Sequence, residues 1–109
     1  MTNNVLVFVE QRRGKILPAS FQLLTAAGRL TASTGGRVEA CIIGEGISAL
    51  VDTVAGYGAK KVYMVDDPEL AMYRAMPYSA ALCAAIDAAV PKIVLIPTTF
   101  MGRDLASRV

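Results

Sequence analysis

The sequence predicts an α/β protein, a three-layer sandwich in which an open parallel sheet carries helices on both faces. Two observations lead to this fold class. Four short runs rich in Val, Ile and aromatic residues recur along the 109 residues, and segments with a helical pattern separate them. Nearly continuous apolar runs are typical of strands covered on both faces, and strand-helix alternation favours parallel strands joined by right-handed crossovers.

The four expected strands cover residues 5–10, 38–43, 61–66 and 92–97. The fourth, KIVLIP, is apolar on both faces and has no inward charge, as expected of an interior strand. Only about two helical turns follow it, so one of its edges is expected to lack a partner. We therefore expect a sheet truncated after strand four, which another chain completes or which the natural protein extends beyond Val109.

The first connection contains a tight turn and a long helix. Arg13-Gly14 predicts a turn that places residues 11–12 opposite residues 15–16. A helix is expected from about Pro18 to Thr34, with proline in its first turn, Ser20 as a possible cap and Gly35-Gly36 at its end. Its apolar positions follow helical spacing, namely Leu23, Ala26, Ala27 and Leu30.

Two further helices are expected between the remaining strands. The second opens near Ile47 and stops at Gly56 and Gly58, and its apolar stripe is Ile47, Leu50, Val51 and Val54. The third starts at Pro77, where a missing N–H costs nothing. Its apolar face is expected to contain Ala81, Leu82, Ala85, Ile86 and Ala89.

Charge and hydropathy exclude two classes of partner. The 11 basic and 9 acidic residues leave a net charge of +2, and no run of like charge occurs. This balance gives no electrostatic footprint for nucleic acid or for an anionic membrane. The apolar stretches are far shorter than the ~20 residues of a spanning helix, and the N-terminus does not resemble a leader. We expect a cytoplasmic protein, bacterial or archaeal, or a mature domain, with no membrane insertion.

The residue types argue against an enzyme or a metal centre. Histidine is absent, and Cys41 and Cys83 lie inside apolar runs rather than in a C-x-x-C motif. Asp66-Asp67-Pro68 could bind a metal or a ribose, but it is also a standard turn opener with no third ligand in view. The four tyrosines are expected to pack in the core or at an interface. We expect no catalytic residues and no metal ligands.

Two glycine-containing loops are candidates for binding a nucleotide. After strand four, Thr98, Thr99, Gly102 and Arg103 could surround a phosphate at a helix start, although helix capping or an interface role is the favoured interpretation. After strand two, Gly44 and Gly46 begin a G-x-G-x-x-G pattern that has Ala49 at the third glycine, with Asp66 about twenty residues on. A tight turn is the favoured interpretation there.

The whole chain resembles the N-terminal domain of the alpha subunit of electron transfer flavoprotein. The most specific pieces are VFVEQRRGKILPAS, YGAKKVY followed by DDP, and the closing GRDLASRV, which occur in the family's order. Ser107 stands where the family often has proline. The resemblance implies a Rossmann-like domain of the adenine nucleotide alpha hydrolase-like type, of which residues 1–109 are the front part.

The resemblance also implies a function and partners. The family's alpha subunit binds FAD mainly through a C-terminal domain that is absent here, so no FAD ligand is expected in this fragment. It pairs with a beta subunit, and the heterodimer carries electrons from acyl-CoA dehydrogenases and similar flavoenzymes of fatty acid beta-oxidation to a quinone oxidoreductase. The expected role is therefore a scaffold or interface domain of an electron carrier, with a degenerate nucleotide site.

Two other interpretations are open at this stage. The chain could be a stand-alone adenine-nucleotide-binding module of the universal-stress-protein type that binds ATP or AMP at Thr98, Gly102 and Arg103. It could also be a self-associating interaction domain that uses the edge of strand four. The sequence does not distinguish a simple carrier from an electron-bifurcating one.

Overall fold

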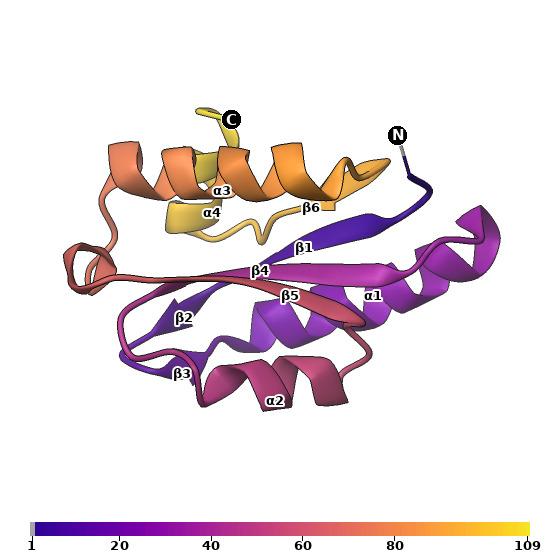
Figure 1. Cartoon of the computed structure of the whole chain (residues 1–109), viewed down its shortest axis with the longest axis horizontal. Coiled ribbons are helices and arrows are strands. Elements are labelled where there is room, and N and C mark those ends of the chain that lie inside the picture. Colours follow the sequence, from indigo (N-terminus) through magenta and orange to yellow (C-terminus); the bar gives the residue numbers. More distant parts are fainter. Residues whose placement is uncertain (1) are drawn as a thin grey trace.

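The computed structural model describes residues 2–109, which form one open sheet covered by helices (Figure 1). The sheet contains β1 (Val5–Val9), β4 (Val38–Gly44), β5 (Lys61–Asp66) and β6 (Ile93–Leu95). Their order is β5-β4-β1-β6, and every neighbouring pair is parallel. This arrangement confirms the predicted parallel sheet.

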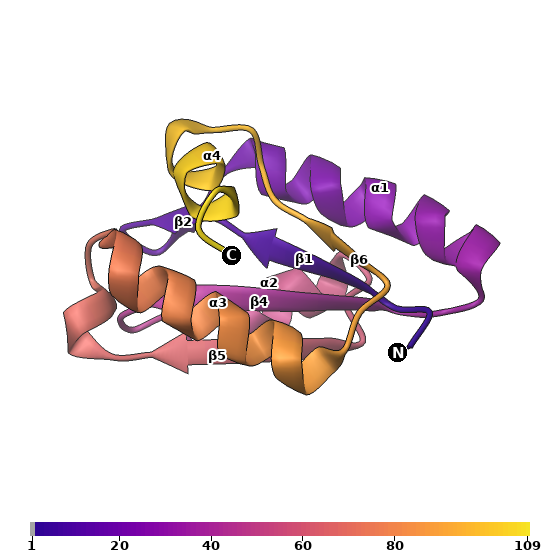
Figure 2. The same ribbon diagram turned by 90° about the horizontal axis from the view of Figure 1, so that it is seen from above.

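Helices cover both faces of the sheet, which makes the three-layer sandwich (Figures 1 and 2). One face carries α1 (Pro18–Thr34) and α2 (Leu50–Gly56), and the other carries α3 (Ala75–Ala89) and α4 (Phe100–Ala106). A single 3-10 turn, η1 (Pro68–Leu70), precedes α3. The buried side chains accordingly form two apolar clusters, one on each side of the sheet.

The first connection matches the predicted turn and helix bounds. Strand β2 (Gln11–Arg12) pairs antiparallel with β3 (Lys15–Ile16). Arg13 and Gly14 between them have φ of 53° and 80°, the backbone that a tight hairpin turn requires. Helix α1 ends at Gly35, whose φ is 77°.

Two expectations for α1 are wrong in detail. Its N-cap is Leu17 rather than Ser20, because the Ser20 hydroxyl accepts a hydrogen bond from the Glu10 backbone N–H at 2.8 Å. This bond fixes which face of α1 meets the sheet. The buried positions are therefore Ser20, Leu24 and Ala27, and the predicted Leu30 is 37% exposed.

The other helix starts are shifted by two or three residues. Helix α2 begins at Leu50, and the expected start at Ile47 belongs to a preceding turn in which Leu50 N–H bonds to the Ile47 carbonyl. Helix α3 begins at Ala75, so Pro77 lies at its third position, where its nitrogen would still lack an intrahelical partner. The predicted face of α3 is confirmed in outline, with Leu82, Ala85 and Ala89 buried.

The edges of the sheet confirm the expected unpartnered edge of strand four but correct the expectation of an interior strand. Over residues 2–109, β6 pairs with β1 and ends the sheet on that side, and all three of its residues are only partly buried. It is therefore an edge strand rather than an interior one. Strand β5 forms the opposite edge, and its Met64 is 43% exposed. Only β1 and β4 have the full burial that continuous apolar runs predict.

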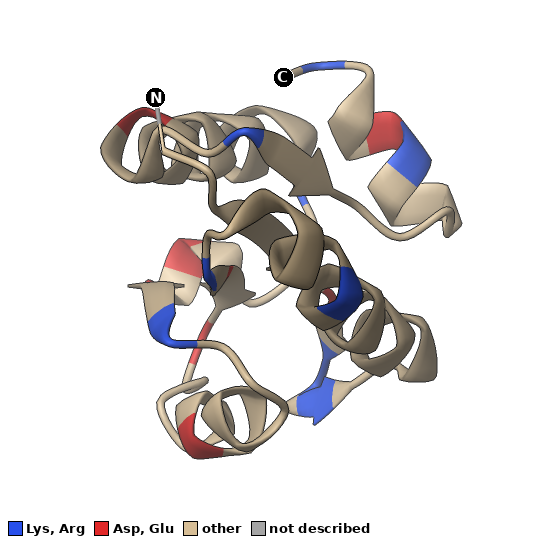
Figure 3. Ribbon diagram, turned by 90° about the vertical axis from the view of Figure 1, so that its right-hand side faces the viewer, with Lys and Arg blue, Asp and Glu red and all other residues tan. Residues whose placement is uncertain are grey.

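The charged residues are spread over the molecule, as the sequence predicts. Figure 3 shows lysine and arginine interspersed with aspartate and glutamate over several elements. Among the helices of residues 2–109, none combines the length and apolar character needed to cross a membrane.

Candidate functional site

The carboxyl ends of β1 and β6 mark the place where an α/β sheet of this type binds ligands. After β1 the chain continues to α1 on one face, whereas after β6 it continues to α4 on the other. The connections therefore diverge between these two neighbouring strands, and such a switch point is the usual crevice for a ligand. Glu10 and Thr99 follow the two strand ends there.

Three of the four residues predicted for this loop take part in the start of α4 instead of forming an open phosphate site. Thr99 is the N-cap of α4, and its hydroxyl accepts a hydrogen bond from the Gly102 N–H at 3.0 Å. A Cβ on Gly102 would lie 1.8 Å from the Pro97 carbonyl oxygen, so glycine is needed for close approach to the chain's own backbone. Arg103 is exposed, and its N–H bonds to the Thr99 carbonyl.

Thr98, the fourth predicted residue, is exposed at the end of the β6 loop. It is next to Thr99, but the capping hydrogen bonds of α4 involve Thr99 alone. The geometry therefore favours the capping interpretation of this loop.

The glycine turn after β4 is closed by an aspartate. The Asp66 carboxylate accepts hydrogen bonds from the Gly46 N–H at 2.9 Å and from the Ile47 N–H at 3.1 Å. Gly46 has a φ of 64°. A Cβ on Gly44 would lie 2.4 Å from the Gln11 side-chain nitrogen. These contacts favour the tight-turn interpretation, in which the Asp66 carboxylate holds the turn.

Asp67 does not take part in this turn but caps the next element. Its carboxylate accepts a hydrogen bond from the Glu69 N–H at 2.9 Å and caps η1. The two neighbouring carboxylates thus hold two separate turns. Within residues 2–109 no group of three or more acidic or cysteine side chains is placed to hold a metal ion.

We predict that Asp66→Ala lowers the free energy of unfolding by roughly 1–3 kcal/mol, because it removes the charged acceptor of two backbone N–H groups. Asp87→Ala is the matched control, since Asp87 is exposed on α3. That control should change the value by less than about 0.5 kcal/mol. Equal effects of the two substitutions in urea denaturation would show that the turn does not depend on Asp66.

These contacts bear directly on whether the described residues could hold the diphosphate of FAD. A dinucleotide site presents free backbone N–H groups at a glycine-rich helix start. Here the N–H groups of Gly46 and Ile47 donate to Asp66, and that of Gly102 donates to Thr99. Both candidate loops are thus satisfied internally, and their residues do not fit a flavin dinucleotide.

Glu10 is a feature of the switch point that the sequence interpretation missed. Its side chain is fully buried, accepts a hydrogen bond from the Thr99 hydroxyl, and lies 3.4 Å from the Arg12 guanidinium. Its second oxygen, Oε2, has that ion pair but no hydrogen bond. An acidic residue at the end of an apolar strand was the available signal. Glu10 links the ends of β1 and β6 to the β2–β3 hairpin.

A hollow opens beside this hairpin at the carboxyl end of the sheet, with a volume of about 280 Å³. Three segments form it: the hairpin, the stretch between η1 and α3 with the start of α3, and the beginning of α4 (Figures 1 and 2). It is lined by Gln11, Arg12, Arg13, Ala71, Met72, Tyr73, Tyr78, Phe100 and Met101. We call it the hairpin hollow.

One wall of the hollow is held by a polar bridge between α4 and the stretch that precedes α3. The Tyr73 hydroxyl donates to the Asp104 carboxylate at 2.6 Å, and Arg108 pairs with the same carboxylate at 3.3 Å. Burial, the hydrogen bond to Asp104 and the charge of Asp104 together raise the pKa of Tyr73 to about 12. The hydrogen bonds from Tyr73 and Arg108 lower the pKa of Asp104.

We predict that Tyr73 ionises near pH 12 rather than near its ordinary value of 10.0. Because the pKa is raised on folding, the stabilisation is complete below about pH 10 and is lost as the pH rises through about 12. For Asp104, whose pKa is lowered, stabilisation is present above 3.8 and is lost as the pH falls through the folded value.

The difference in ultraviolet absorbance between wild type and Tyr73→Phe isolates this titration. It should rise with a midpoint near 12, and Asp104→Asn should move the midpoint down towards 10. A difference curve centred at 10 in the wild type would contradict the hydrogen-bonded geometry.

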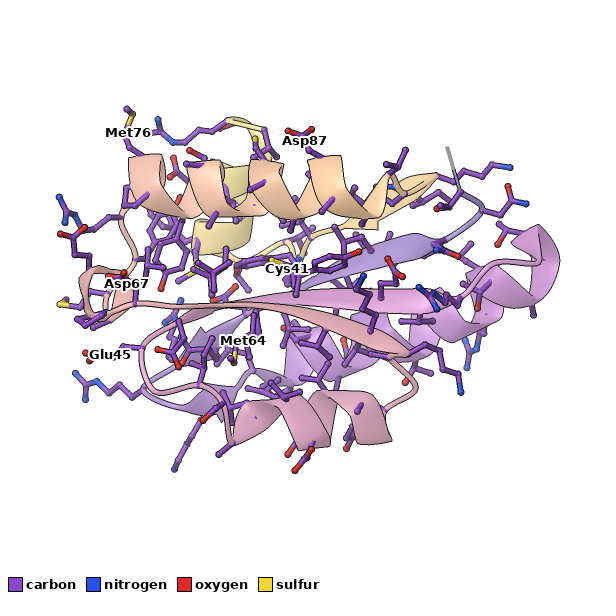
Figure 4. All side chains as sticks on the ribbon, in the orientation of Figure 1. Cys41, Glu45, Met64, Asp67, Met76 and Asp87 are labelled. Carbon is purple, nitrogen blue, oxygen red and sulfur yellow. The ribbon has the colours of Figure 1, made fainter. Side chains whose placement is uncertain are left out.

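The cysteines have no arrangement for nucleophilic chemistry. Cys41 is buried between the sheet and α3 (Figure 4), and burial raises the pKa of its thiol to about 12. A thiol with so high a pKa is scarcely ionised at neutral pH and is a poor nucleophile. Cys83 is partly buried on α3.

Comparison with known proteins identifies relatives over nearly the full length of the chain. The family model described as the electron transfer flavoprotein domain matches residues 5–109. The electron transfer flavoprotein subunit alpha of Syntrophomonas wolfei subsp. wolfei is 42% identical over 94% of this chain and 31% of its own length. The subunit alpha of Megasphaera elsdenii is 36% identical over 96% of this chain and 31% of its own length.

A third relative has a different name. The acryloyl-CoA reductase electron transfer subunit beta of Anaerotignum propionicum is 33% identical over 96% of this chain and 29% of its own length. The chain thus spans about a third or less of the length of each of these relatives.

Proposed function

The chain belongs to the electron transfer flavoprotein family, with an N-terminal domain of the alpha type, and we propose that it is the front part of that domain and serves as a scaffold in an electron carrier. The proposal rests chiefly on the match over residues 5–109 together with relatives that are named as electron transfer subunits. In this role the domain presents protein surface, and electrons move through a flavin bound by other parts of the carrier.

The hydrogen bonds within both glycine loops support the proposal that the flavin is bound by other parts of the carrier. The Gly46 and Gly102 N–H groups, which a bound phosphate would need, already donate to Asp66 and Thr99. In our proposal FAD is held through a C-terminal domain and a second subunit, and FAD supplies the one-electron and two-electron chemistry. The residues of this chain position and support that assembly.

The proposed partners follow from the family. We propose a heterodimer with an electron transfer flavoprotein beta subunit, electron donors of the acyl-CoA dehydrogenase type in fatty acid oxidation, and a quinone oxidoreductase as acceptor. The carrier reduced by a dehydrogenase and its acyl-CoA substrate under anaerobic conditions should lose its flavin absorbance near ~450 nm, a rough value for oxidised flavin. Retention of the band with every such donor would contradict the donor class.

A direct test concerns the chain by itself. FAD fluorescence should show no saturable quenching when the purified 109-residue chain is added at micromolar concentration, and ATP should give no binding heat. Saturable FAD binding would contradict the scaffold role. Saturable ATP binding that Arg103→Ala abolishes would instead support a nucleotide-sensing module.

A further inference from the structure

We propose that the Glu10 carboxylate is an internal anion, which occupies the ligand crevice at the switch point and keeps small anionic ligands out of it. Glu10 follows β1 directly, Thr99 precedes α4, and the connections diverge between these two segments. This is where a sheet of this type binds its ligand. Glu10 is thus a specificity-determining residue, whether or not the chain serves in an electron carrier.

The groups that hold the carboxylate are those that would bind an anionic ligand. The Thr99 hydroxyl donates a hydrogen bond to Oε1, and the Arg12 guanidinium lies 3.4 Å from Oε2. Hydroxyl and guanidinium groups are donors to carboxylate and phosphate oxygens. The Thr99 oxygen also accepts the Gly102 N–H at 3.0 Å, which leaves the hydroxyl hydrogen for Glu10. The donors of the crevice are therefore directed at an anion that the chain itself supplies.

The carboxylate is fixed in the crevice by the backbone that carries it. The Glu10 N–H donates to the Ser20 hydroxyl at 2.8 Å, and the Glu10 carbonyl accepts from the Leu17 N–H at 3.0 Å. Both bonds tie the end of β1 to the start of α1. Because the side chain is also fully buried, a ligand could displace the carboxylate only by disrupting this part of the fold.

The carboxylate is incompletely paired, which argues against a role in stability alone. Oε2 is buried and has no hydrogen bond, and its ion-pair partner Arg12 has a side chain that is 60% exposed. A buried ion pair often stabilises a protein less than well-packed apolar side chains of similar volume would. A negative charge, however, repels any phosphate or carboxylate that enters the crevice. Exclusion of anions therefore accounts for the charge, whereas packing does not.

Chemical rescue by acetate tests this role of Glu10. Glu10→Ala removes a CH₂–COO⁻ group, which has nearly the size and charge of acetate, and leaves the Thr99 hydroxyl and Arg12 without their acceptor. At an acetate concentration about five times its dissociation constant, this variant should melt about 4–8 °C higher than in sodium chloride of equal ionic strength. The NMR signal of ¹³C-labelled acetate should broaden with Glu10→Ala and not with the wild type.

Three further substitutions separate acetate binding from a general effect on stability. Glu10→Gln fills the same space, so its melting temperature should be equal in acetate and chloride. Adding Arg12→Gln to Glu10→Ala removes one donor of the crevice and should weaken acetate binding several-fold. Gly28→Ala places a Cβ that would meet no atom within 4 Å, and it is added to Glu10→Ala to stabilise α1 if the single variant does not fold.

The expected result is a dependence of Glu10→Ala on acetate that Glu10→Gln lacks. An equal response of Glu10→Ala to acetate and chloride would overturn the assignment, as would saturable acetate binding by the wild type. Failure of Glu10→Ala/Gly28→Ala to refold from urea in acetate would overturn it too. In each of these cases Glu10 is a structural residue, and the proposed function is unaffected.

Discussion

Gly102→Ala is expected to destabilise the protein by about 3 kcal/mol, the upper part of the usual range for overpacking. The new Cβ would lie 1.8 Å from the Pro97 carbonyl oxygen, and this backbone atom cannot move without displacing the start of α4. Phe100 and Met101, which line the hairpin hollow, precede Gly102 directly. The same substitution should therefore weaken the binding of any partner that contacts the hollow.

Gly28→Ala is the matched control for this effect. Gly28 lies inside α1, and a Cβ there would meet no atom within 4 Å. Because alanine favours the helix over glycine, this variant should be more stable by roughly 0.5–1 kcal/mol. Urea denaturation of both variants measures the difference. A Gly102→Ala protein as stable as the wild type would show that Pro97 and Gly102 do not approach closely.

Phe8→Ala is expected to have the largest effect of any single substitution considered, a loss of about 3–5 kcal/mol in the free energy of unfolding. Phe8 is 1% exposed at the middle of the sheet and belongs to the apolar cluster under α3 and α4. A domain of this size is stable by about 5–15 kcal/mol, so the variant should melt at a much lower temperature or fail to fold.

Phe100→Ala separates burial from residue type. The same side chain is removed, but Phe100 is 82% exposed, so stability should change by less than about 0.5 kcal/mol. We therefore expect the two substitutions to have different effects. Phe8→Ala should impair folding, whereas Phe100→Ala should leave the fold intact. Similar melting temperatures for the two variants would contradict the burial of Phe8.

The parts of the fold that depend on local chemistry could be predicted from the sequence. The hairpin at Arg13-Gly14 and the end of α1 follow from Gly14 and Gly35, which tolerate positive φ, and the structure confirms both. Strand order is a tertiary property. The pattern of residues 92–97 therefore gave no signal that β6 would lie beside β1, although the short helix after it did indicate an edge without a partner.

In the candidate site, too, local features could be predicted from the sequence and tertiary ones could not. A capping role for Thr99 could be predicted because threonine followed by a helical pattern is a local signal. The hairpin hollow could not, because residues 11–13, 71–78 and 100–101 meet only in the folded chain. Glu10 was missed for a related reason: its burial and its contacts with Thr99 and Arg12 involve three connected segments at the switch point.

A scaffold domain acts through the surface that it presents to other proteins, and not through its glycine loops. Both glycine loops are closed by the chain's own side chains, whereas Phe100 and Met72 remain exposed beside two arginines. Variation in the loops should therefore alter stability.

Sedimentation velocity of the purified chain, alone and mixed with its cognate second flavoprotein subunit, tests whether the chain is a scaffold in a two-subunit carrier. We predict that the chain alone sediments as a monomer at micromolar concentration and that the mixture gives a single faster species with one copy of each chain. Two independent boundaries at every mixing ratio would contradict the scaffold role. A faster species formed by the chain alone and unchanged by the second subunit would instead identify a self-associating domain.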